Sequence, residues 1–451
     1  MSEQRHRPPN PSEPIASFVS TLSFEEIPED AVRLAERCFV DTVGVTLAGA
    51  QTGAGAAAAA IADLGETTVL GRDESASMSD AALANGTAGH GLDFDDVSWG
   101  MDGHPSVALV APALAVGERL DATGRELVTA FVAGFETECA IAAPISPSHY
   151  GRGWHPTSTF GVFGAAAVAA SLLECSAEET RHALHIAASM ASGLKRNFGS
   201  MTKPLHAGHA VRSGLTAARL ADEGFTADSA AIAGDDGFWD LYAGEEGVDP
   251  TAGHELGSEW AILTEGVHVK KYPCCYFTHT SIANVIDLVT EHGIDPESVA
   301  SIAVHAAGGA VDALAHDDPN TGLEAKFSMP YTVAYGVVTR RVDLAAFEDE
   351  HVDDPAVQAV RERVTLELNS DLHYDSHESR LRLETTDGTV YEQVRENPPG
   401  IHENPLSIPE LRAKYEMCAE RALSETDVEA SWAALESLRE QSSTRELLAH
   451  L

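Results

Sequence analysis

The stretch Gly161 to Leu173, GVFGAAAVAASLL, contains no charged residue and is apolar on every side when it is wound as a helix. Such a helix has no face to offer to water, so it is typical of the centre of a multi-helix core. Pro105 to Val116, PSVALVAPALAV, has the same character. The longest nearly unbroken apolar stretch, Thr159 to Leu173, is too short to span a bilayer. These segments predict a domain built around buried helices.

Helix-start signals lie on both sides of these segments. Ser23 with Glu26, and Ser176 with Glu179, have the capping-box spacing, in which a serine and a glutamate three residues later satisfy the first backbone amides of a helix. The second box predicts a helix that runs towards Ala191. We therefore expect helices to dominate the chain from its start to about residue 267.

The pattern changes in the last third of the chain. Residues 301–306 and 364–368 alternate apolar and polar side chains with the period of a β-strand. Residues 380–394 hold an Asp387-Gly388 turn between two further alternating runs, which predicts a β-hairpin. This part of the chain is therefore expected to contain a sheet.

Length and pattern together predict two structural units. At 451 residues the chain exceeds the size at which one hydrophobic core usually stops growing. Helical periodicity returns from about Ile408 to the end. We expect a mostly α protein, with a large all-helical domain built from both chain ends (1–267 and 401–451) and a smaller α/β (α+β) lid domain at 268–400.

The charge of the chain excludes some partners. Seventy aspartates and glutamates against 29 lysines and arginines give a formal net charge of −41. Nucleic acids and anionic membranes both require a basic surface, so neither is expected as a partner. An acid-rich surface is expected where molar salt screens self-repulsion, so we expect a halophilic protein; an acidic protein at ordinary salt is the alternative. In a chain with only six lysines, each is expected to make a specific contact or to serve chemistry: Lys195, Lys203, Lys270, Lys271, Lys326 and Lys414.

Cysteine usage and the first residues indicate the compartment. The six cysteines are scattered, without a CxxC pair or a zinc-type spacing. The first residues, MSEQRHRPPNPSEP, contain no apolar signal segment. We therefore expect a cytoplasmic protein.

Five separated segments carry histidine, lysine or carboxylate side chains among glycine, proline and aromatic residues. Carboxylates beside a histidine can bind a metal or act as acid and base, although they also occur at acidic helix ends. A lone histidine is often a satisfied interior residue, and a lysine at a helix N-terminus can recognise a carboxylate or phosphate. Together the segments predict a pocket for a multiply charged anion, in which cations stabilise the enediolate formed by proton removal. The segments are Gly89–Ser106, Tyr150–Thr157, Thr202–His209, Lys270–His279 and Lys326–Tyr331.

Taken in this order, the segments resemble the MmgE/PrpD family, whose members include 2-methylcitrate dehydratase, cis-aconitate decarboxylase and iminodisuccinate epimerase. The resemblance extends from Ile27 to about Tyr415. Val97-Ser98 departs from it, because many members carry Thr-His directly after the aspartate run, and this puts the exact substrate in doubt. The residues that carry the resemblance are Leu92-Asp93-Phe94-Asp95-Asp96 with His104-Pro105-Ser106, Gly153-Trp154-His155-Pro156-Thr157, Lys203-Pro204-Leu205-His206-Ala207-Gly208, Lys271-Tyr272-Pro273 with His279, and Lys326-Phe327-Ser328-Met329-Pro330-Tyr331.

The resemblance implies a homodimer that acts on a small di- or tricarboxylate without a metal or any other cofactor. It also implies which side chains line the site. The expected catalytic residues are Asp93, His104, His155 and His279, and the expected substrate-binding residues are Lys203, Lys271 and Tyr331.

We expect a carbon–oxygen lyase (hydro-lyase) that dehydrates a small hydroxy-tricarboxylate, with 2-methylcitrate as the first candidate. Cis-aconitate decarboxylation, epimerisation of an amino-dicarboxylate and non-catalytic carboxylate binding are the alternatives. His155 or His104 is the expected base, with His279 or Asp93 as its acid counterpart. Lys203 and Lys271 are expected to be exposed in the pocket, so that replacing either leaves folding nearly unaffected.

Overall fold

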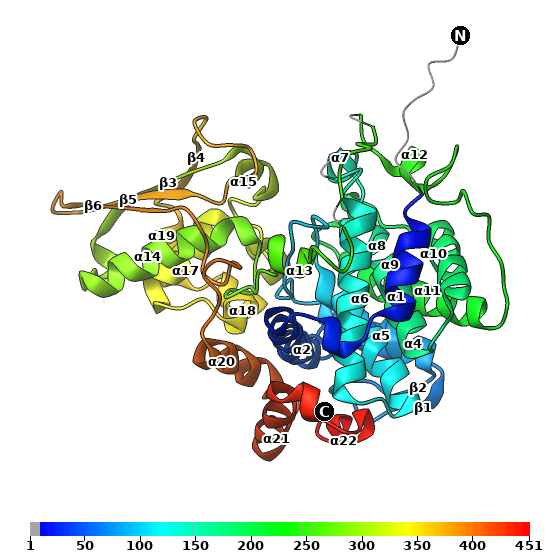
Figure 1. Cartoon of the computed structure of the whole chain (residues 1–451). Coiled ribbons are helices and arrows are strands. Elements are labelled where there is room, and N and C mark those ends of the chain that lie inside the picture. Colours follow the sequence, from blue (N-terminus) through cyan, green and yellow to red (C-terminus); the bar gives the residue numbers. More distant parts are fainter. Residues whose placement is uncertain (1–9, 147, 246, 254) are drawn as a thin grey trace, which may run out of the picture. The chain divides into compact units, whose positions relative to one another are not determined.

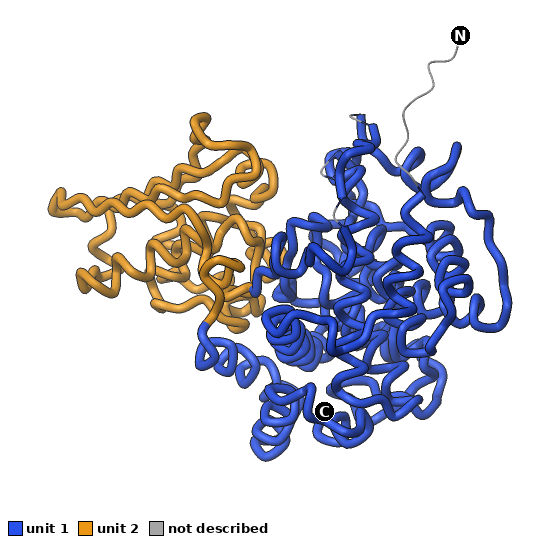
Figure 2. The backbone as a smooth tube through the Cα atoms, in the orientation of Figure 1, with its two compact units in different colours: residues 1–269, 407–451 blue, residues 270–406 orange. Residues whose placement is uncertain are grey.

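A computed structural model of the chain describes residues 10–146, 148–245, 247–253 and 255–451. Most of the proline-rich start, residues 1–9, lies outside the described residues. The chain divides into two compact units: unit 1 contains residues 1–269 and 407–451, and unit 2 contains residues 270–406 (Figure 2). The expected boundaries at 267/268 and 400/401 thus lie a few residues early. The second one moves because the chain enters a helix of unit 1 only at Ser407, whose side chain and Glu410 form a capping box.

Unit 1 is built around the apolar segment with which the sequence analysis began. That segment forms helix α9, which packs against α5, α6, α10 and α11 (Figure 1). Contact with α11 is close, because a Cβ atom added at Gly214 of α11 would lie 2.5 Å from the carbonyl oxygen of Val162. Only glycine allows the two backbones to approach in this way.

The predicted helix starts are present. Ser176 and Glu179 form a capping box at the start of α10, and Ser23 and Glu26 form one on a short 3₁₀ turn. A small antiparallel hairpin, which the sequence did not reveal, joins β1 to β2. The elements of unit 1 are α1 (Ser12–Thr21), η1 (Phe24–Glu26), α2 (Glu29–Gly49), α3 (Gly53–Ala60), β1 (Leu64–Thr68), β2 (Ser75–Ala76), α4 (Met78–Gly89), α5 (Pro105–Leu120), α6 (Gly124–Ala142), α7 (Ser148–Gly151), α8 (Pro156–Thr159), α9 (Gly161–Leu172), α10 (Ala177–Met190), η2 (Lys195–Asn197), α11 (Thr202–Asp222), α12 (Phe238–Tyr242), α13 (Ala261–Thr264), α20 (Ile408–Ala419), α21 (Glu425–Glu436), η6 (Leu438–Glu440) and α22 (Thr444–Leu448).

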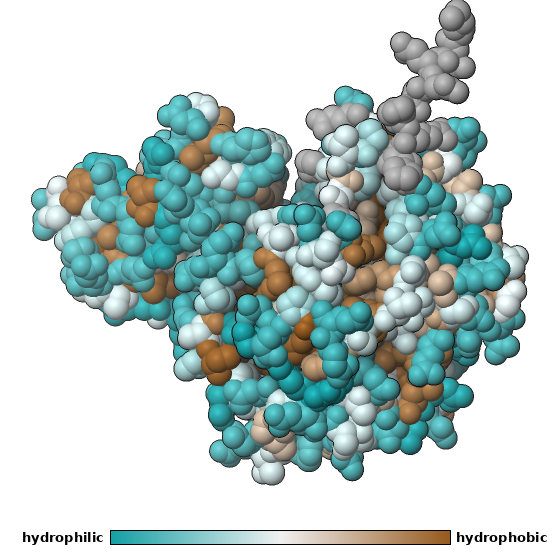
Figure 3. All heavy atoms as spheres, viewed as in Figure 1, coloured by the Kyte–Doolittle hydropathy of each residue, from teal (hydrophilic) through white to brown (hydrophobic). Residues whose placement is uncertain are grey.

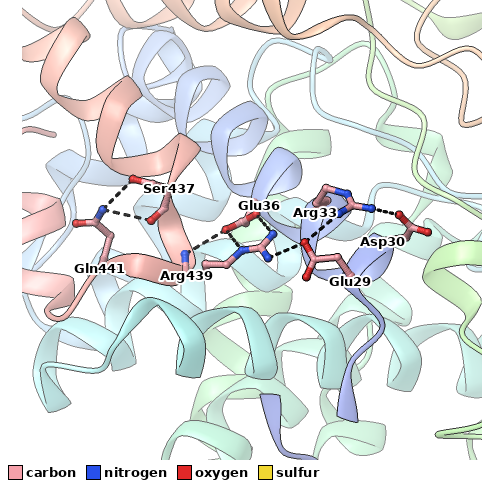
Figure 4. Close-up of polar contacts among 7 residues, drawn as sticks. All are labelled: Glu29, Asp30, Arg33, Glu36, Ser437, Arg439 and Gln441. Carbon is pink, nitrogen blue, oxygen red and sulfur yellow. Dashed lines mark hydrogen bonds and ion pairs between the residues drawn. The ribbon is translucent and has the colours of Figure 1, made fainter. Parts of the chain in front are cut away.

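Both ends of the chain contribute to unit 1, as predicted. Helix α20 packs on α2, and α22 packs on α5. Arg439 of η6 donates hydrogen bonds to Glu36 and Glu29 of α2 (Figure 4). Segments some 400 positions apart in the sequence are thereby joined on one surface.

Unit 2 contains the predicted sheet. Its strand order is β4-β3-β5-β6, with β3 parallel to β4 and the other neighbours antiparallel. Helices α14 and α17 pack on the sheet and share one apolar core with it (Figure 1). The elements of unit 2 are η3 (Tyr276–Thr278), α14 (His279–Glu291), η4 (Pro296–Ser298), β3 (Val299–Ala306), α15 (Gly308–Ala313), α16 (Gly322–Ala325), α17 (Met329–Thr339), η5 (Leu344–Phe347), α18 (Asp349–Val352), α19 (Pro355–Arg361), β4 (Val364–Leu368), β5 (Ser379–Thr385) and β6 (Val390–Arg395).

The fold class predicted from the sequence is confirmed: the chain is mostly helical, with a smaller α/β unit. Figure 3 shows a surface dominated by hydrophilic residues, with apolar side chains scattered over it. Within the described ranges, none of the helices combines the length and the hydropathy that crossing a membrane requires.

Candidate active site

The aspartate run of the first segment lies in a buried loop between α4 and α5. Helix α4 ends at Gly89, and His90 is its C-cap. Asp93 adopts a left-handed backbone conformation with φ of +54°, which allows the chain to turn back at this point. Asp95 and Asp96 are fully buried. This burial rules out the alternative in which the run is a solvated acidic helix end.

Two histidines of this loop share one carboxylate. Nδ1 of His90 lies 2.7 Å from Oδ2 of Asp95, and Nδ1 of His104 lies 3.3 Å from the same oxygen. Burial alone would raise the pKa of Asp95, but the two imidazoles outweigh it and hold that pKa well below its usual range. Burial lowers the pKa of His90 to about 4, against the attraction of Asp95. A neutral His90 therefore donates its Nδ1–H to an ionised Asp95.

His104 and His155 are placed by the same local device. Each directly precedes a proline at the start of a helix, Pro105 of α5 and Pro156 of α8, and each is the N-cap residue. Proline disfavours helical geometry in the residue before it, so both histidines are extended, with φ and ψ of −106° and 97° at His104 and −103° and 100° at His155. The backbone N–H of His104 also donates to Oγ1 of Thr157, 3.0 Å away on α8. This bond ties the two histidine-proline turns to each other.

His155 lies inside a group of imidazoles. Its ring is stacked on that of His90, with centroids 5.4 Å apart, and Phe198 meets it edge-on at 4.9 Å. Its Nδ1 lies 3.0 Å from Nδ1 of His206 on α11. Burial, followed by the charges of His90 and Lys203, holds the pKa of His155 well below its usual range. His155 is therefore neutral at physiological pH and has a basic nitrogen to offer.

Lys203 supplies the cation of the cluster. It lies in the first turn of α11, which begins at Thr202. Its Nζ donates to Oδ1 of Asp93 at 2.5 Å, and both side chains are about nine-tenths buried. The expectation of an exposed lysine was wrong: Lys203 neutralises a buried carboxylate. The positive charge of Lys203 lies at the positive end of the helix dipole, which is unfavourable, and the carboxylate of Asp93 offsets this cost.

A second layer of buried acids lies behind this cluster. Burial, and then the charge of Asp41, raises the pKa of Asp96 to about 7, and burial raises the pKa of Glu138 well above its usual range. Lys414 of α20 contacts Oδ1 of Asp41 at 2.6 Å and donates to the carbonyl oxygen of Phe94 at 2.8 Å. The C-terminal return of the chain thus fixes the backbone of the aspartate run.

The remaining predicted site residues belong to unit 2. Nε2 of His279 lies 3.3 Å from the carbonyl oxygen of Cys274, and its ring lies between Tyr272 and Tyr276. Lys271 is half-buried. Tyr331 is fully buried, and its hydroxyl donates to the carbonyl oxygen of Ala346. The site roles of Lys271, His279 and Tyr331 stay predictions.

The structure brings together four predicted residues in unit 1, namely Asp93, His104, His155 and Lys203, and adds others. In the sequence analysis, Asp95 and His206 appear only as parts of motifs, and His90 only within the segment Gly89–Ser106. Their signal was in the sequence, because His90 lies five residues before Asp95 and His206 lies three residues after Lys203, one helical turn away. What the spacing could not show is which nitrogen meets which oxygen.

Among the described residues, His90, Asp95 and His104 form a buried group that could hold a cation, because their ligand atoms all lie within 4.8 Å of one another. Nδ1 of His90 is hydrogen-bonded to Oδ2 of Asp95, whereas Nδ1 of His104, 3.3 Å from the same oxygen, makes no hydrogen bond to it. A cation here would have to replace the hydrogen between His90 and Asp95. The same side chains also offer the chemistry of paired imidazoles beside a lysine.

Comparisons with known proteins identify the family of this chain. A mouse (Mus musculus) cis-aconitate decarboxylase is 27% identical over 95% of this chain and 91% of that protein. The human (Homo sapiens) cis-aconitate decarboxylase is 26% identical over 95% and 90%, and one from Aspergillus terreus is 25% identical over 92% and 90%. Residues 13–251 match the MmgE/PrpD N-terminal domain, and residues 272–440 match the MmgE/PrpD C-terminal domain. The chain therefore belongs to the MmgE/PrpD family, the family its motifs resemble.

Proposed function

We propose that this protein is a lyase for small tricarboxylates that works through a carbanion stabilised by cations, with cis-aconitate decarboxylation as its first candidate reaction. The observation that carries the proposal is the buried cluster of His104, His155 and Lys203 around Asp93 and Asp95. The relatives named cis-aconitate decarboxylase, matched over nine-tenths of their length, support this choice among the family's reactions.

The environments of the two histidines assign them different roles. His104 lies beside the ionised Asp95, which stabilises an imidazolium when the ring carries a second proton. His155 lies among other imidazoles and Lys203, which disfavour a positive charge on it. An imidazole beside a carboxylate and a second imidazole among cationic groups can serve as an acid and a base. We assign the acid to His104 and the base to His155.

In decarboxylation, the bond to one carboxylate breaks, CO2 leaves, and the electron pair stays on the carbon skeleton. His104 then delivers its proton to that carbon, which completes the bond count. Lys203 contributes positive charge next to the remaining carboxylates, and the excess charge of the carbanion is stabilised by such preorganised cations. Asp93 holds the ammonium group of Lys203 in place.

Dehydration of 2-methylcitrate is a second candidate, and the neutral state of His155 favours it. Loss of water needs a base that removes a C–H proton and an acid that protonates the leaving hydroxyl. His155 fits the first task and His104 the second. Decarboxylation has no need of the base, so the two reactions make different demands on His155.

The test is incubation of the protein with cis-aconitate, 2-methylcitrate, citrate and iminodisuccinate, followed by NMR of the products. We expect CO2 release from cis-aconitate. Alkene formation from 2-methylcitrate would instead establish the hydro-lyase, inversion of iminodisuccinate would indicate an epimerase, and no turnover of any compound would favour a carboxylate-binding protein.

Single variants assign the roles within whichever reaction is found. Loss of a general acid or base costs on the order of 10²–10⁴-fold in rate. His104→Ala is expected to lose activity in this range for either lyase, whereas His155→Ala should do so for dehydration alone. His450→Ala changes an exposed histidine of the same unit and serves as the control.

A further inference from the structure

The contact between His155 and His206 carries an inference beyond the assignment of His155 as a base. The two Nδ1 atoms lie 3.0 Å apart, which is hydrogen-bond distance. His206 is one helical turn after Lys203 on α11 and is 8% exposed. Its carbonyl oxygen accepts a hydrogen bond from Oγ of Ser158, 3.0 Å away on α8. A hydrogen bond therefore joins the two elements, α8 and α11, beside the two rings.

Two ring nitrogens at this distance need one hydrogen between them. Burial lowers the pKa of both histidines, that of His206 to about 4, so both rings are neutral at physiological pH. A neutral imidazole carries its hydrogen on one nitrogen and a lone pair on the other. If His155 donates from Nδ1, its Nε2 keeps a lone pair; if His206 donates, Nε2 of His155 carries the hydrogen and is no base.

Donation from Nδ1 of His155 to Nδ1 of His206 is the arrangement that remains possible when His155 is protonated. When Nε2 takes a proton, both nitrogens of His155 carry hydrogen, and Nδ1 can only donate. A His206 that presents its Nδ1 lone pair accepts this stronger, charge-assisted bond. A His206 that presented Nδ1–H would face a second N–H at 3.0 Å and would oppose the proton transfer.

We propose that His206 is a positioning residue that accepts a hydrogen bond from Nδ1 of His155 and thereby fixes the tautomer in which Nε2 of His155 is the basic nitrogen. The inference rests on the proposed base role of His155 for its effect on rate, but the tautomer itself is a property of the protein without substrate. His206 acts on the reaction only through His155.

The groups that face this pair are known. His90, His104 and Lys203 face His155, and Lys203 and His209 face His206. None of them is changed in the variants below except His209, which is the control. His209 lies on the same helix as His206, is exposed, and contacts Ser213.

Three variants separate the acceptor from the shape of the side chain. His206→Asn places an amide oxygen near the position of Nδ1 and keeps the acceptor. His206→Gln carries its amide about one bond further out, and His206→Leu has no acceptor. His209→Asn repeats the first change where no contact with His155 exists.

The direct measurement is the ¹⁵N NMR spectrum of the imidazole nitrogens of His155, recorded without substrate. We expect the Nδ1–H tautomer in the wild type, in His206→Asn and in His209→Asn. In His206→Gln and His206→Leu we expect the Nε2–H form to appear. An Nε2–H tautomer in the wild type, or a His155 spectrum unchanged in both of the last two variants, would overturn the proposal.

Kinetics provide the second measurement, on the substrate that the product panel identifies. If the reaction is a dehydration, His206→Gln and His206→Leu should lower kcat/KM about tenfold to a hundredfold, because a misplaced base loses part of the catalytic contribution of proton transfer. The pH of the acidic limb of the profile, where His155 becomes protonated, should move with the loss, and His206→Asn should restore most of both. If it is a decarboxylation, which has no need of the base, both variants should leave kcat/KM unchanged, and the ¹⁵N spectrum alone tests the inference. A tautomer change without any turnover would leave this inference standing and refute the proposed function, so the two can fail separately. If His206→Leu does not fold, His206→Gln decides.

Discussion

Unit 1 contains two clusters of charged residues that are built in opposite ways. The surface network consists of Glu29, Asp30, Arg33, Glu36 and Arg439 (Figure 4). The buried cluster consists of His90, Asp93, Asp95, His104 and Lys203. In the first, the side chains of Glu29 and Asp30 are 60% and 73% exposed, whereas in the second those of His90 and Asp95 are fully buried.

The difference in burial decides what each cluster contributes. Water and salt screen exposed pairs, so each contributes little to stability, and the surface network mainly joins the N-terminal α2 to the C-terminal η6. Inside the protein, an unpaired charge is costly, so every member of the buried cluster depends on its partner. The same burial sets the protonation states that the chemistry needs. The comparison therefore predicts that substitutions in the two clusters differ in size, in pH dependence and in salt dependence.

The largest effect is expected for Lys203→Ala. The variant leaves the carboxylate of Asp93 buried without its cation, and removing one partner of a buried pair costs about 3–5 kcal/mol of unfolding free energy. Activity should fall as well, since the proposed function requires the positive charge of Lys203. Chemical denaturation and kcat/KM give the two measurements.

A double variant and a second lysine provide the controls. Asp93→Asn combined with Lys203→Met removes both charges and should recover most of the stability, but not the activity. Lys195→Ala changes a half-buried lysine of the same unit, whose ammonium group contacts the carbonyl oxygen and the ring of Tyr150, and should cost about 1 kcal/mol. A Lys203→Ala protein as stable as the wild type would mean that the buried cluster behaves like a surface one.

A second, smaller effect is expected for Asp96→Asn, and it depends on pH. The pKa of Asp96 is raised in the folded protein to about 7, by burial and then by Asp41, whereas an unfolded aspartate titrates near 3.9. Between these values the folded protein binds the proton and the unfolded chain does not, so the stability from this group is lost as pH rises. The unfolding free energy of Asp96→Asn minus that of the wild type should therefore be higher at pH 8 than at pH 4, by on the order of 2–4 kcal/mol.

Unfolding free energies of wild type and variant, measured from pH 4 to pH 8, test this difference. Asp30→Asn in the exposed surface network is the control and should give a nearly constant difference. Parallel curves for Asp96→Asn and the wild type would show that Asp96 is ionised in the folded protein throughout.

The sequence predicted the fold well because the fold is set by local patterns. Apolar residues on all sides of α9, the capping boxes and the alternation in β3 are each visible within a dozen residues. The hairpin of β1 and β2 escaped because Leu64–Thr68, LGETT, has one buried residue and no alternation. A strand with few buried side chains leaves no apolar–polar alternation in the sequence, so it cannot be predicted from that pattern.

The site was predictable by residue type but not by role. His149 lies directly before the segment that contains His155, yet both nitrogens of His149 are satisfied, Nδ1 by the carbonyl oxygen of Tyr242 and Nε2 by Oγ1 of Thr159. His149 is therefore an interior histidine with satisfied nitrogens, which is the alternative that the sequence analysis gave for a lone histidine. Only contacts with residues distant in the sequence distinguish the two, and spacing cannot supply them.

A third and smaller effect is expected for Arg439→Gln in the surface network. The guanidinium of Arg439 donates to both carboxylate oxygens of Glu36, and this is the least exposed pair of the network. The two-pronged contact raises its contribution above that of a simple exposed pair, to about 1 kcal/mol at 0.1 M salt. Arg33→Gln, in the more exposed part of the same network, should leave the melting temperature unchanged. Equal losses of stability in Arg439→Gln and Lys203→Ala would contradict the expected difference between the surface network and the buried cluster.

Salt provides the last prediction, with the smallest effect per residue but the largest number of residues involved. A chain with a net charge of −41 repels itself and also slows the approach of a tricarboxylate at low ionic strength. The Debye length falls from about 10 Å at 0.1 M to about 3 Å at 1 M, so added KCl removes both effects. Melting temperature and kcat/KM of the wild type should therefore rise together from 0.1 M towards molar KCl.

The deficit in melting temperature of Arg439→Gln relative to the wild type should shrink over the same range, because salt screens the ion pair that this variant lacks. The deficit of Lys203→Ala should stay constant, because the pair of Lys203 and Asp93 is out of reach of the screening ions. A titration of all three proteins in parallel tests this, and a steady decline of the wild type with KCl would show that its acidic surface is not adapted to salt.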